Sequence, residues 1–355
     1  MSTASEVVVD ETWLVEAVRR IFAAEGFGPE AADCIATTLV EADLAGVGSH
    51  GSMLVPMYVD RLRAGSVSRR EEAEVVHRQG AVTVLDGHHA LGQLTGRQSM
   101  ALAVESAKEH GVGVVVVRHA FHFGRAASYA EQAAAAGCIG VAMSNTRPLM
   151  PAPGGAEPVV GNNPLAVVAP TPTRPMVLDM ALSEAALGKI RLAEAAGTPI
   201  PDTWATDADG NPTTDAGAAV KGMLLPSGGP KGFGLALVVD VLTGVLSGGA
   251  SGAQVQGLYA DMAVPNDCAH FFLALDVAHF GDPDGFAERI DALTDFVLGS
   301  RPRDGVAAVR LPGQRAQERT AEQRAQGVTL QRSVLDGLRV TAATVGTSLP
   351  EGVTV

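Results

Sequence analysis

The segment at residues 112–145, VGVVVVRHAFHFGRAASYAEQAAAAGCIGVAMSN, decides the fold class. It opens with a valine-rich run (112–118), passes through an alanine-rich stretch of helical composition (124–136) and closes with a second short apolar run (139–145). Short β-branched runs are typical of strands, and their alternation with helices is typical of a sheet covered by helices. The segment therefore predicts an α/β fold.

The same alternation continues on both sides of this segment. Four more runs have the length and composition of strands: VTVLDG (82–87), PLAVVAP (164–170), PMVLDMA (175–181) and HFFLALDV (270–277). Further helices are predicted at 92–109, 184–196 and 231–247, and the Pro/Gly/Asp-rich stretch 198–230 is predicted to be a long, ordered, functional loop. We expect a central α/β domain over residues 76–285, with helices on both faces of its sheet.

Both ends of the chain have helical patterns. The first helix is predicted to be capped by Thr12 and to stop at Gly26, and the second to run from Pro29 to about Leu44. Near the other end, helices are predicted at 284–298, 314–326 and 330–344, with a short strand near 305–310. We expect residues 1–75 and 286–355 to pack together as a helical part.

Composition argues against several classes of protein. The 355-residue chain has a formal net charge of −13, which would repel a phosphate backbone, so nucleic acid is not an expected partner. No run approaches the ~18 uncharged apolar residues of a membrane span. The N-terminus does not have the pattern of a signal peptide, and the three cysteines lie far apart without the spacing of a disulfide framework or a thiolate metal site. These features predict a cytoplasmic protein that binds neither a membrane nor a metal.

The α/β alternation raises the question of a Rossmann fold, but the sequence lacks its fingerprint. No GxGxxG lies between a first strand and its helix, and Gly111 and Gly113 precede the valine-rich strand instead of following it. The segment GPKGFG at 229–234 lacks the Walker spacing and the Ser or Thr after its lysine. A dinucleotide that binds here must bind in another way.

A glycine-rich break after the second helix contains Ser49 and His50. An accessible imidazole is a natural proton donor to a carbonyl oxygen whose carbon receives a hydride, although a helix-ending loop is the simpler interpretation. Asp179 lies in an apolar run, where an ionised carboxylate is costly unless it is paired. It is predicted either to cap a helix that starts near Ser183 or to orient and charge an imidazole.

Two further places offer ligand-binding groups. His119 and His122 follow the valine-rich strand, where an α/β sheet binds its ligands, and hydrogen bonding to a cofactor or substrate is favoured over a metal site because no third ligand is near. Lys231 opens an apolar helix, whose N-terminus would suit a phosphate or carboxylate. A solvated surface lysine is the alternative.

Longer motifs follow in order along most of the chain. They are AGVGSHGSMLVPMYVDRLRAG (45–65), LDGHHALGQLTG (85–96), the stretch 122–170 with HFG and SNT, VLDMALSEAALGKI (177–190), WATDADGNPTTD (204–215), LLPSGGPKGFGLALVVDVLTGVLSGG (224–249) and RLPGQR (310–315). Together they resemble the malate/L-lactate dehydrogenase family, which lacks a Rossmann fold. Its relatives include ureidoglycolate, sulfolactate and hydroxycarboxylate dehydrogenases and piperideine-2-carboxylate reductases.

The resemblance implies a fold and a set of site residues. It implies a mixed central sheet that binds NAD or NADP in an extended form, and an intertwined homodimer. His50 would be the proton donor, assisted by Ser49 and Asp179. The cofactor contacts of the family fall on His122, Phe123, Gly124, Ser144, Thr146, Met180, Ala181, Lys231, Leu311, Pro312 and Gly313.

The implied reaction is the reversible NAD(P)H-dependent reduction of a small 2-oxo acid. The alternatives are reduction of a cyclic imine carboxylate and a non-catalytic protein that binds a dinucleotide. Many relatives carry an Arg four residues after the SHG histidine, where this chain has Leu54, and many read NS before HFG, where this chain reads His119-Ala120-Phe121. If Asp179 contacts His50, we expect a raised pKa for the imidazole and a lowered pKa for the carboxyl.

Overall fold

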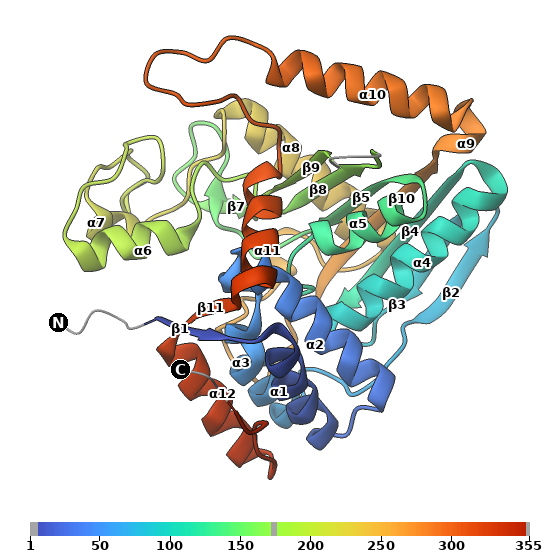
Figure 1. The fold of residues 1–355 in the computed structure, drawn as a ribbon. Helices are drawn as coiled ribbons and strands as arrows, with labels where there is room; N and C mark the ends of the chain where they lie inside the picture. Colours follow the sequence, from blue (N-terminus) through green and yellow to red (C-terminus); the bar gives the residue numbers. More distant parts are fainter. Residues whose placement is uncertain (1–5, 172–175, 353–355) are drawn as a thin grey trace.

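A computed structural model describes residues 6–171 and 176–352 and has a mixed seven-stranded sheet at its centre (Figure 1). The strands lie in the order β2 (Glu74–Gln79), β3 (Val82–Asp86), β4 (Val112–Ala120), β10 (Cys268–Asp276), β5 (Cys138–Ser144), β8 (Leu165–Ala169) and β9 (Met176–Met180). Only β3 and β4 pair in parallel within this sheet of the described residues. The predicted α/β class, with a mixed and non-Rossmann sheet, is confirmed.

Each of the six predicted strand runs contains a strand, although position 175 of the run 175–181 lies outside the described residues. The strand predicted near 305–310 is wrong. This stretch is an exposed loop in which Val306 is only partly covered, and none of the strands in the described residues pairs with its backbone. A short apolar run does not form a strand without such a partner.

Helices cover both faces of the sheet, as predicted (Figure 1). One face carries α4 (Gly92–His110) and α5 (Ala127–Ala135), and the other carries α8 (Pro230–Asp240), which continues through a π-helical turn at Val241–Val245. The core beneath α4 and α5 is built from small alanines together with Tyr129 and Phe272. Small side chains let these helices lie close to the strands.

Residues from both ends of the chain share one core, which residues 286–298 do not join. Its helices are α1 (Glu11–Ala24), α2 (Pro29–Leu44), α3 (Val55–Ala64) and α12 (Arg332–Thr344), while α11 (Gln314–Gln326) runs beside α2. The strands β1 (Glu6–Val9) and β11 (Val328–Gln331) pair with each other, which shortens the helix predicted at 330–344. Thr12 is not the cap of the first helix, because the helix already begins at Glu11; Asp10 accepts from the amides of Thr12 and Trp13 at 2.8 and 3.1 Å.

A smaller third core lies under residues 149–239. It contains the hairpin of β6 (Met150–Pro151) and β7 (Pro158–Val160), with α6 (Leu187–Ala196) and α7 (Ala216–Lys221). Ile200, Ala205 and Leu224 are buried here. The stretch 198–230 is therefore an ordered loop, as predicted, and it contains one short helix.

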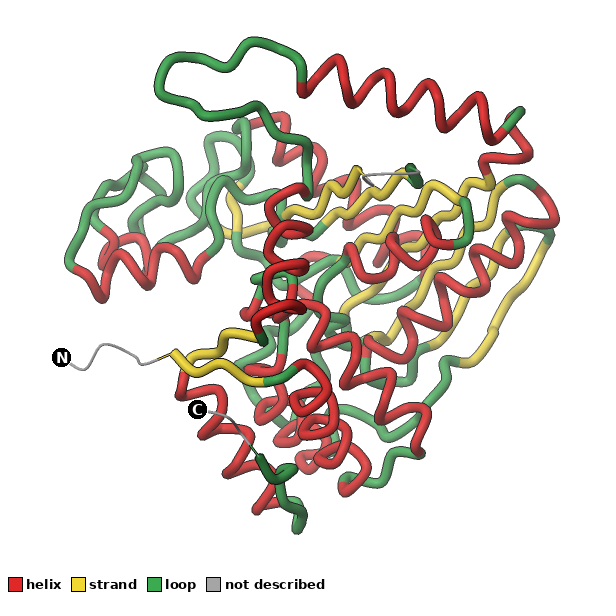
Figure 2. Tube along the Cα trace, in the orientation of Figure 1, coloured by secondary structure: helices red, strands yellow, loops and turns green. Residues whose placement is uncertain are grey.

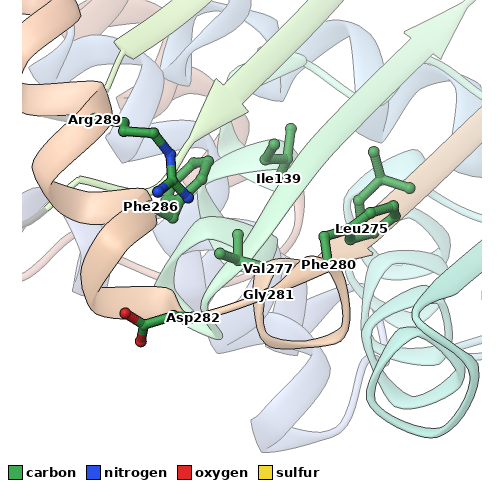
Figure 3. A pocket seen from close by; sticks show the side chains of 8 residues that line it. All are labelled: Ile139, Leu275, Val277, Phe280, Gly281, Asp282, Phe286 and Arg289. Atoms are coloured by element: carbon green, nitrogen blue, oxygen red, sulfur yellow. The ribbon is translucent and has the colours of Figure 1, made fainter.

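The segment α9 (Val277–Phe280) and α10 (Pro283–Leu298) extends over the sheet and is joined to α11 by a long loop (Figure 2). Within α10 only Thr294 is buried. An apolar cavity of about 150 Å³ lies where α10 begins, between Ile139, Leu275 and Phe286 (Figure 3). The described residues contain no helix that is both long and apolar enough to cross a membrane.

Candidate active site

One edge of the central sheet gathers most of the predicted site residues. His270 at the start of β10 is in register with Ser144 at the end of β5, and Leu165 pairs with both Met143 and Met180. The ends of β4, β5 and β9 therefore meet at this edge. The cavity in Figure 3 lies at the opposite end of the same strands and is not part of this site.

The glycine-rich break forms a short 3₁₀ turn, Gly48–His50, directly after α2. Ser49 Oγ lies 2.9 Å from His50 Nδ1. Among the described residues, Nε2 of His50 has no hydrogen-bond partner, so this nitrogen is available to a ligand. Burial lowers the pKa of His50, which opposes the raised value expected from the sequence.

His122 stands beside His50, with their ring centroids 5.5 Å apart. The hydroxyl of Tyr58 lies 2.6 Å from His122 Nδ1 and accepts a hydrogen bond from Gln93 Nε2 at 3.1 Å. We infer that the hydroxyl donates its proton to Nδ1 and that the ring proton of His122 lies on Nε2. Burial and the neighbouring His50 hold the pKa of His122 well below its usual value, so the ring is neutral.

The next two residues of the HFG motif are also fixed by their surroundings. The Phe123 ring stacks on His270 with centroids 4.5 Å apart, and burial lowers the pKa of His270 to about 3. A Cβ at Gly124 would lie 3.5 Å from the carbonyl oxygen of His50, so the HFG segment touches the SHG turn. The structure thus brings together two motifs that are far apart in the sequence.

The SNT loop is held by a buried amide network. Asn145 Nδ2 donates to Asp240 Oδ1 at 3.0 Å, and Asn163 Oδ1 accepts from the amide of Thr146 at 2.8 Å. The Thr146 hydroxyl donates to Asn162 Oδ1 at 3.0 Å. These bonds tie the loop to α8, whose first turn carries the exposed side chain of Lys231.

The Leu311-Pro312-Gly313 turn packs against the edge strand β9. The amide of Val177 donates to Pro312 O at 3.3 Å. Gly313 has φ +82°, and a Cβ there would lie 2.5 Å from the Val177 Cβ, so only glycine fits without a shift. Asp179 points to the same face of β9 as Val177, because side chains alternate along a strand.

Asp179 has a different partner from the two expected. Its Oδ2 lies 3.5 Å from Nε of the buried Arg125 and accepts from the amide of Ala127 at 3.3 Å, in the first turn of α5. Burial raises the pKa of Asp179 against the opposing effect of Arg125, which is the reverse of the expected direction. It does not cap a helix near Ser183, since α6 begins only at Leu187. No hydrogen bond or ion pair between Asp179 and His50 occurs in the described part of the chain.

Arg125 also donates to both carboxylate oxygens of Glu131 at 2.8 Å. This pair lines a cavity of about 370 Å³ between α2, α5 and α11, with Glu41 and Arg324 on the other walls. His119, the other histidine that follows the valine-rich strand, contacts Asp86, with its Nδ1 3.0 Å from Asp86 Oδ2. Within residues 6–171 and 176–352, no group of three or more His, Cys, Asp or Glu side chains is arranged to hold a metal ion.

Sequence reasoning missed Tyr58, Gln93, Arg125 and His270, although the first three lie inside the motifs quoted above. An imidazole held by a hydroxyl at the edge of a mixed sheet is suited to passing a proton to a carbonyl, the step that accompanies hydride transfer. Fold and site together are those of a dehydrogenase that does not use the Rossmann fold. A model of the malate/L-lactate dehydrogenase family matches residues 9–339, and the chain belongs to this family.

Three relatives show the range of the family. Malate dehydrogenase of Pyrococcus horikoshii is 36% identical over 335 residues, covering 92% of each chain, and its solved structure superposes with a TM-score of 0.89 over 98% of each chain. A (2R)-3-sulfolactate dehydrogenase (NADP(+)) of Chromohalobacter salexigens is 36% identical over 312 residues, covering 88% of this chain and 91% of its own. A Δ1-piperideine-2-carboxylate reductase structure from Pseudomonas syringae pathovar tomato is 28% identical, with a TM-score of 0.84 over 94% of this chain and 99% of its own.

Proposed function

We propose that the protein reversibly reduces a small 2-oxo acid with NADH or NADPH, and that His50 donates the proton. The observation that carries this proposal is the contact of Ser49 Oγ with His50 Nδ1, which leaves Nε2 to face a substrate beside the neutral His122. The bound cofactor supplies the hydride. Protonated His50 donates through Nδ1 to Ser49 and through Nε2 to the developing alkoxide oxygen, so the imidazole ends the step neutral.

The residues at this sheet edge suit a nicotinamide dinucleotide. His122 presents a neutral N–H, and Ser144, Thr146 and the Leu311–Gly313 turn offer hydroxyl and backbone groups along the same edge. Lys231 stands at the N-terminus of α8, where helix amides and an ammonium group both favour a phosphate. We assign the cofactor contacts to these residues and to Phe123, Gly124, Met180 and Ala181. Both NAD and NADP are kept as candidates.

Asp179, in this proposal, supplies a negative charge to the site. Arg125 and the Ala127 amide hold its carboxylate in place, and its negative charge favours the imidazolium form of His50. Asp179 thereby assists His50 without a hydrogen bond to it in the free protein.

The likeness to a Δ1-piperideine-2-carboxylate reductase structure favours a second substrate class. Leu54 is buried in the core of the helical part, so this position offers no cation to a substrate carboxylate. A cyclic imine carboxylate, the substrate class of the piperideine reductase relative, would use the same proton donor. Piperideine-2-carboxylate, pyruvate and oxaloacetate, each tested with NADH and with NADPH, separate the two classes by the loss of reduced-cofactor absorbance.

The decisive variant for the proposed reaction is His50→Ala. We expect it to abolish reduction while cofactor affinity stays nearly unchanged, because the imidazole acts on the substrate. Full turnover in this variant would refute the assignment. A wild-type protein that binds NAD(P)H but reduces none of a broad panel of oxo and imino acids would favour the non-catalytic alternative.

We also propose a cytoplasmic homodimer. The outer face of α8 and its π-helical continuation exposes six large apolar side chains, Leu235, Leu237, Val238, Val241, Val245 and Leu246, and α10 exposes Leu293 and Phe296. Surfaces of this kind mark protein contacts. Val238→Asp should yield monomers in light scattering, whereas Val340→Asp, at an exposed valine of α12, should not.

The proposed cytoplasmic location is supported by the three free cysteines, because free thiols are typical of a reducing compartment.

A further inference from the structure

Asp43 lies directly beneath the turn that carries His50. It belongs to the last turn of α2, and it is only 4% exposed. Its Oδ2 accepts a hydrogen bond from the amide of Ser52 at 2.8 Å. A Cβ on Gly51 would lie 2.0 Å from Asp43 Oδ1, so the backbone that follows His50 rests on this carboxyl group.

No cation among the described residues pairs with the carboxyl group of Asp43. Burial raises the pKa of Asp43 to about 7, and only the contacts with Ser52 oppose this shift. Asparagine would accept the same amide hydrogen bond without the cost of a buried charge. What the loop requires at position 43 is therefore a hydrogen-bond acceptor of this shape for the Ser52 amide, and not a negative charge.

The support is itself rigid. Gln323 of α11 donates through Nε2 to the carbonyl oxygens of Asp43 and Leu44, both at 2.8 Å, and its Oε1 accepts from the amide of Thr329 at 2.7 Å. The end of α2 is thus anchored to the C-terminal helices. Movement of the SHG turn relative to α2 requires breaking the Asp43–Ser52 bond.

We propose that Asp43 is a positioning residue that holds the Gly48–Ser52 loop so that His50 stands against His122 with Ser49 on its Nδ1. This inference rests on the proposed function. Asp43 touches neither substrate nor cofactor; it acts through the backbone of Gly51 and Ser52. Its loss should therefore change the proton-transfer step and leave cofactor binding intact.

The test compares Asp43→Ala with Asp43→Asn. Alanine removes the acceptor of the Ser52 amide, and we expect kcat to fall by about tenfold or more, with the KM for the cofactor changed by less than about twofold. Asparagine keeps an acceptor of the same shape and should retain most of kcat. Glu25→Gln, a buried acid of the same helical core paired with Arg63 and Arg69, is the matched control and should leave kcat unchanged.

A second readout does not depend on turnover. In protein labelled at the histidine rings, the His50 signal in the NMR spectrum should shift in Asp43→Ala and stay near its wild-type position in Asp43→Asn. If the wild type reduces no substrate, the proposed function fails while this readout still tests the loop. A wild-type kcat and His50 signal in folded Asp43→Ala, or an equal loss of kcat in folded Asp43→Asn, would overturn the positioning role.

Discussion

Tyr58→Phe tests the network that fixes His122. The hydroxyl is fully buried and makes two hydrogen bonds, to His122 Nδ1 at 2.6 Å and from Gln93 Nε2 at 3.1 Å. Each such bond is worth about 0.5–1.5 kcal/mol, so their loss should destabilise the protein by about 1–3 kcal/mol. The upper end applies because the substitution takes the hydroxyl partner away from two buried nitrogens, Gln93 Nε2 and His122 Nδ1.

The same substitution should weaken cofactor binding. Without the Tyr58 hydroxyl, the proton of His122 can sit on either nitrogen, and Nε2 no longer donates reliably to a ligand. A loss of about 1 kcal/mol corresponds to roughly fivefold in the dissociation constant, measured by fluorescence titration with NAD(P)H. Ser99→Ala removes a buried hydroxyl that donates to Thr95 O and should destabilise the protein without changing cofactor affinity. Equal cofactor affinity in Tyr58→Phe and wild type would refute the assignment of His122.

Three further predictions follow from charges in the structure. Lys231→Ala should raise the KM for the cofactor more than it lowers kcat, because a phosphate contact is equal in ground and transition states; an unchanged KM would contradict this placement. Burial lowers the pKa of His50, and reduction consumes its proton, so kcat/KM for reduction should fall as pH rises through a value below 6.5. In Asp179→Asn the fall should occur at a still lower pH. A fall only above 6.5 would support the raised His50 pKa that the sequence predicted. Burial raises the pKa of Asp43 from 3.8 to about 7, so the folded state binds this proton more tightly than the unfolded state. The free energy of unfolding should therefore decline as pH rises from 3.8 to about 7, and denaturant titrations of Asp43→Asn should lack that decline.

The sequence predicts six of the seven strands of the sheet because these are short β-branched runs whose pattern is local; it misses β2, all of whose residues are exposed. It also predicts that His50 lies in a glycine-rich turn and that His122 follows a strand, since both features are visible without tertiary structure. The strand near 305–310 was wrong because strand formation depends on a pairing partner, which the local pattern does not contain. The cap of α1 was misplaced by two residues, from Asp10 to Thr12, because both residue types cap helices.

The partners of the site residues could not be predicted in the same way. Asp179 in its apolar run signals that a counter-charge exists, but the sequence does not say which one. Arg125 becomes that partner only because α5 starts beside β9 in the folded chain. The roles of Tyr58 and Asp43 likewise depend on burial and on contacts between segments far apart, which no local pattern encodes.

The anchoring of α2 by Gln323 has a consequence for how the protein is made on the ribosome. The SHG turn is synthesised early, but its support includes a helix that begins at Gln314 and a strand that ends at Gln331. A nascent chain that has not yet emerged beyond this point lacks the groups that fix the end of α2. Reducing activity should therefore arise only once nearly the whole chain has left the exit tunnel, and fragments that stop before α11 should accumulate without it.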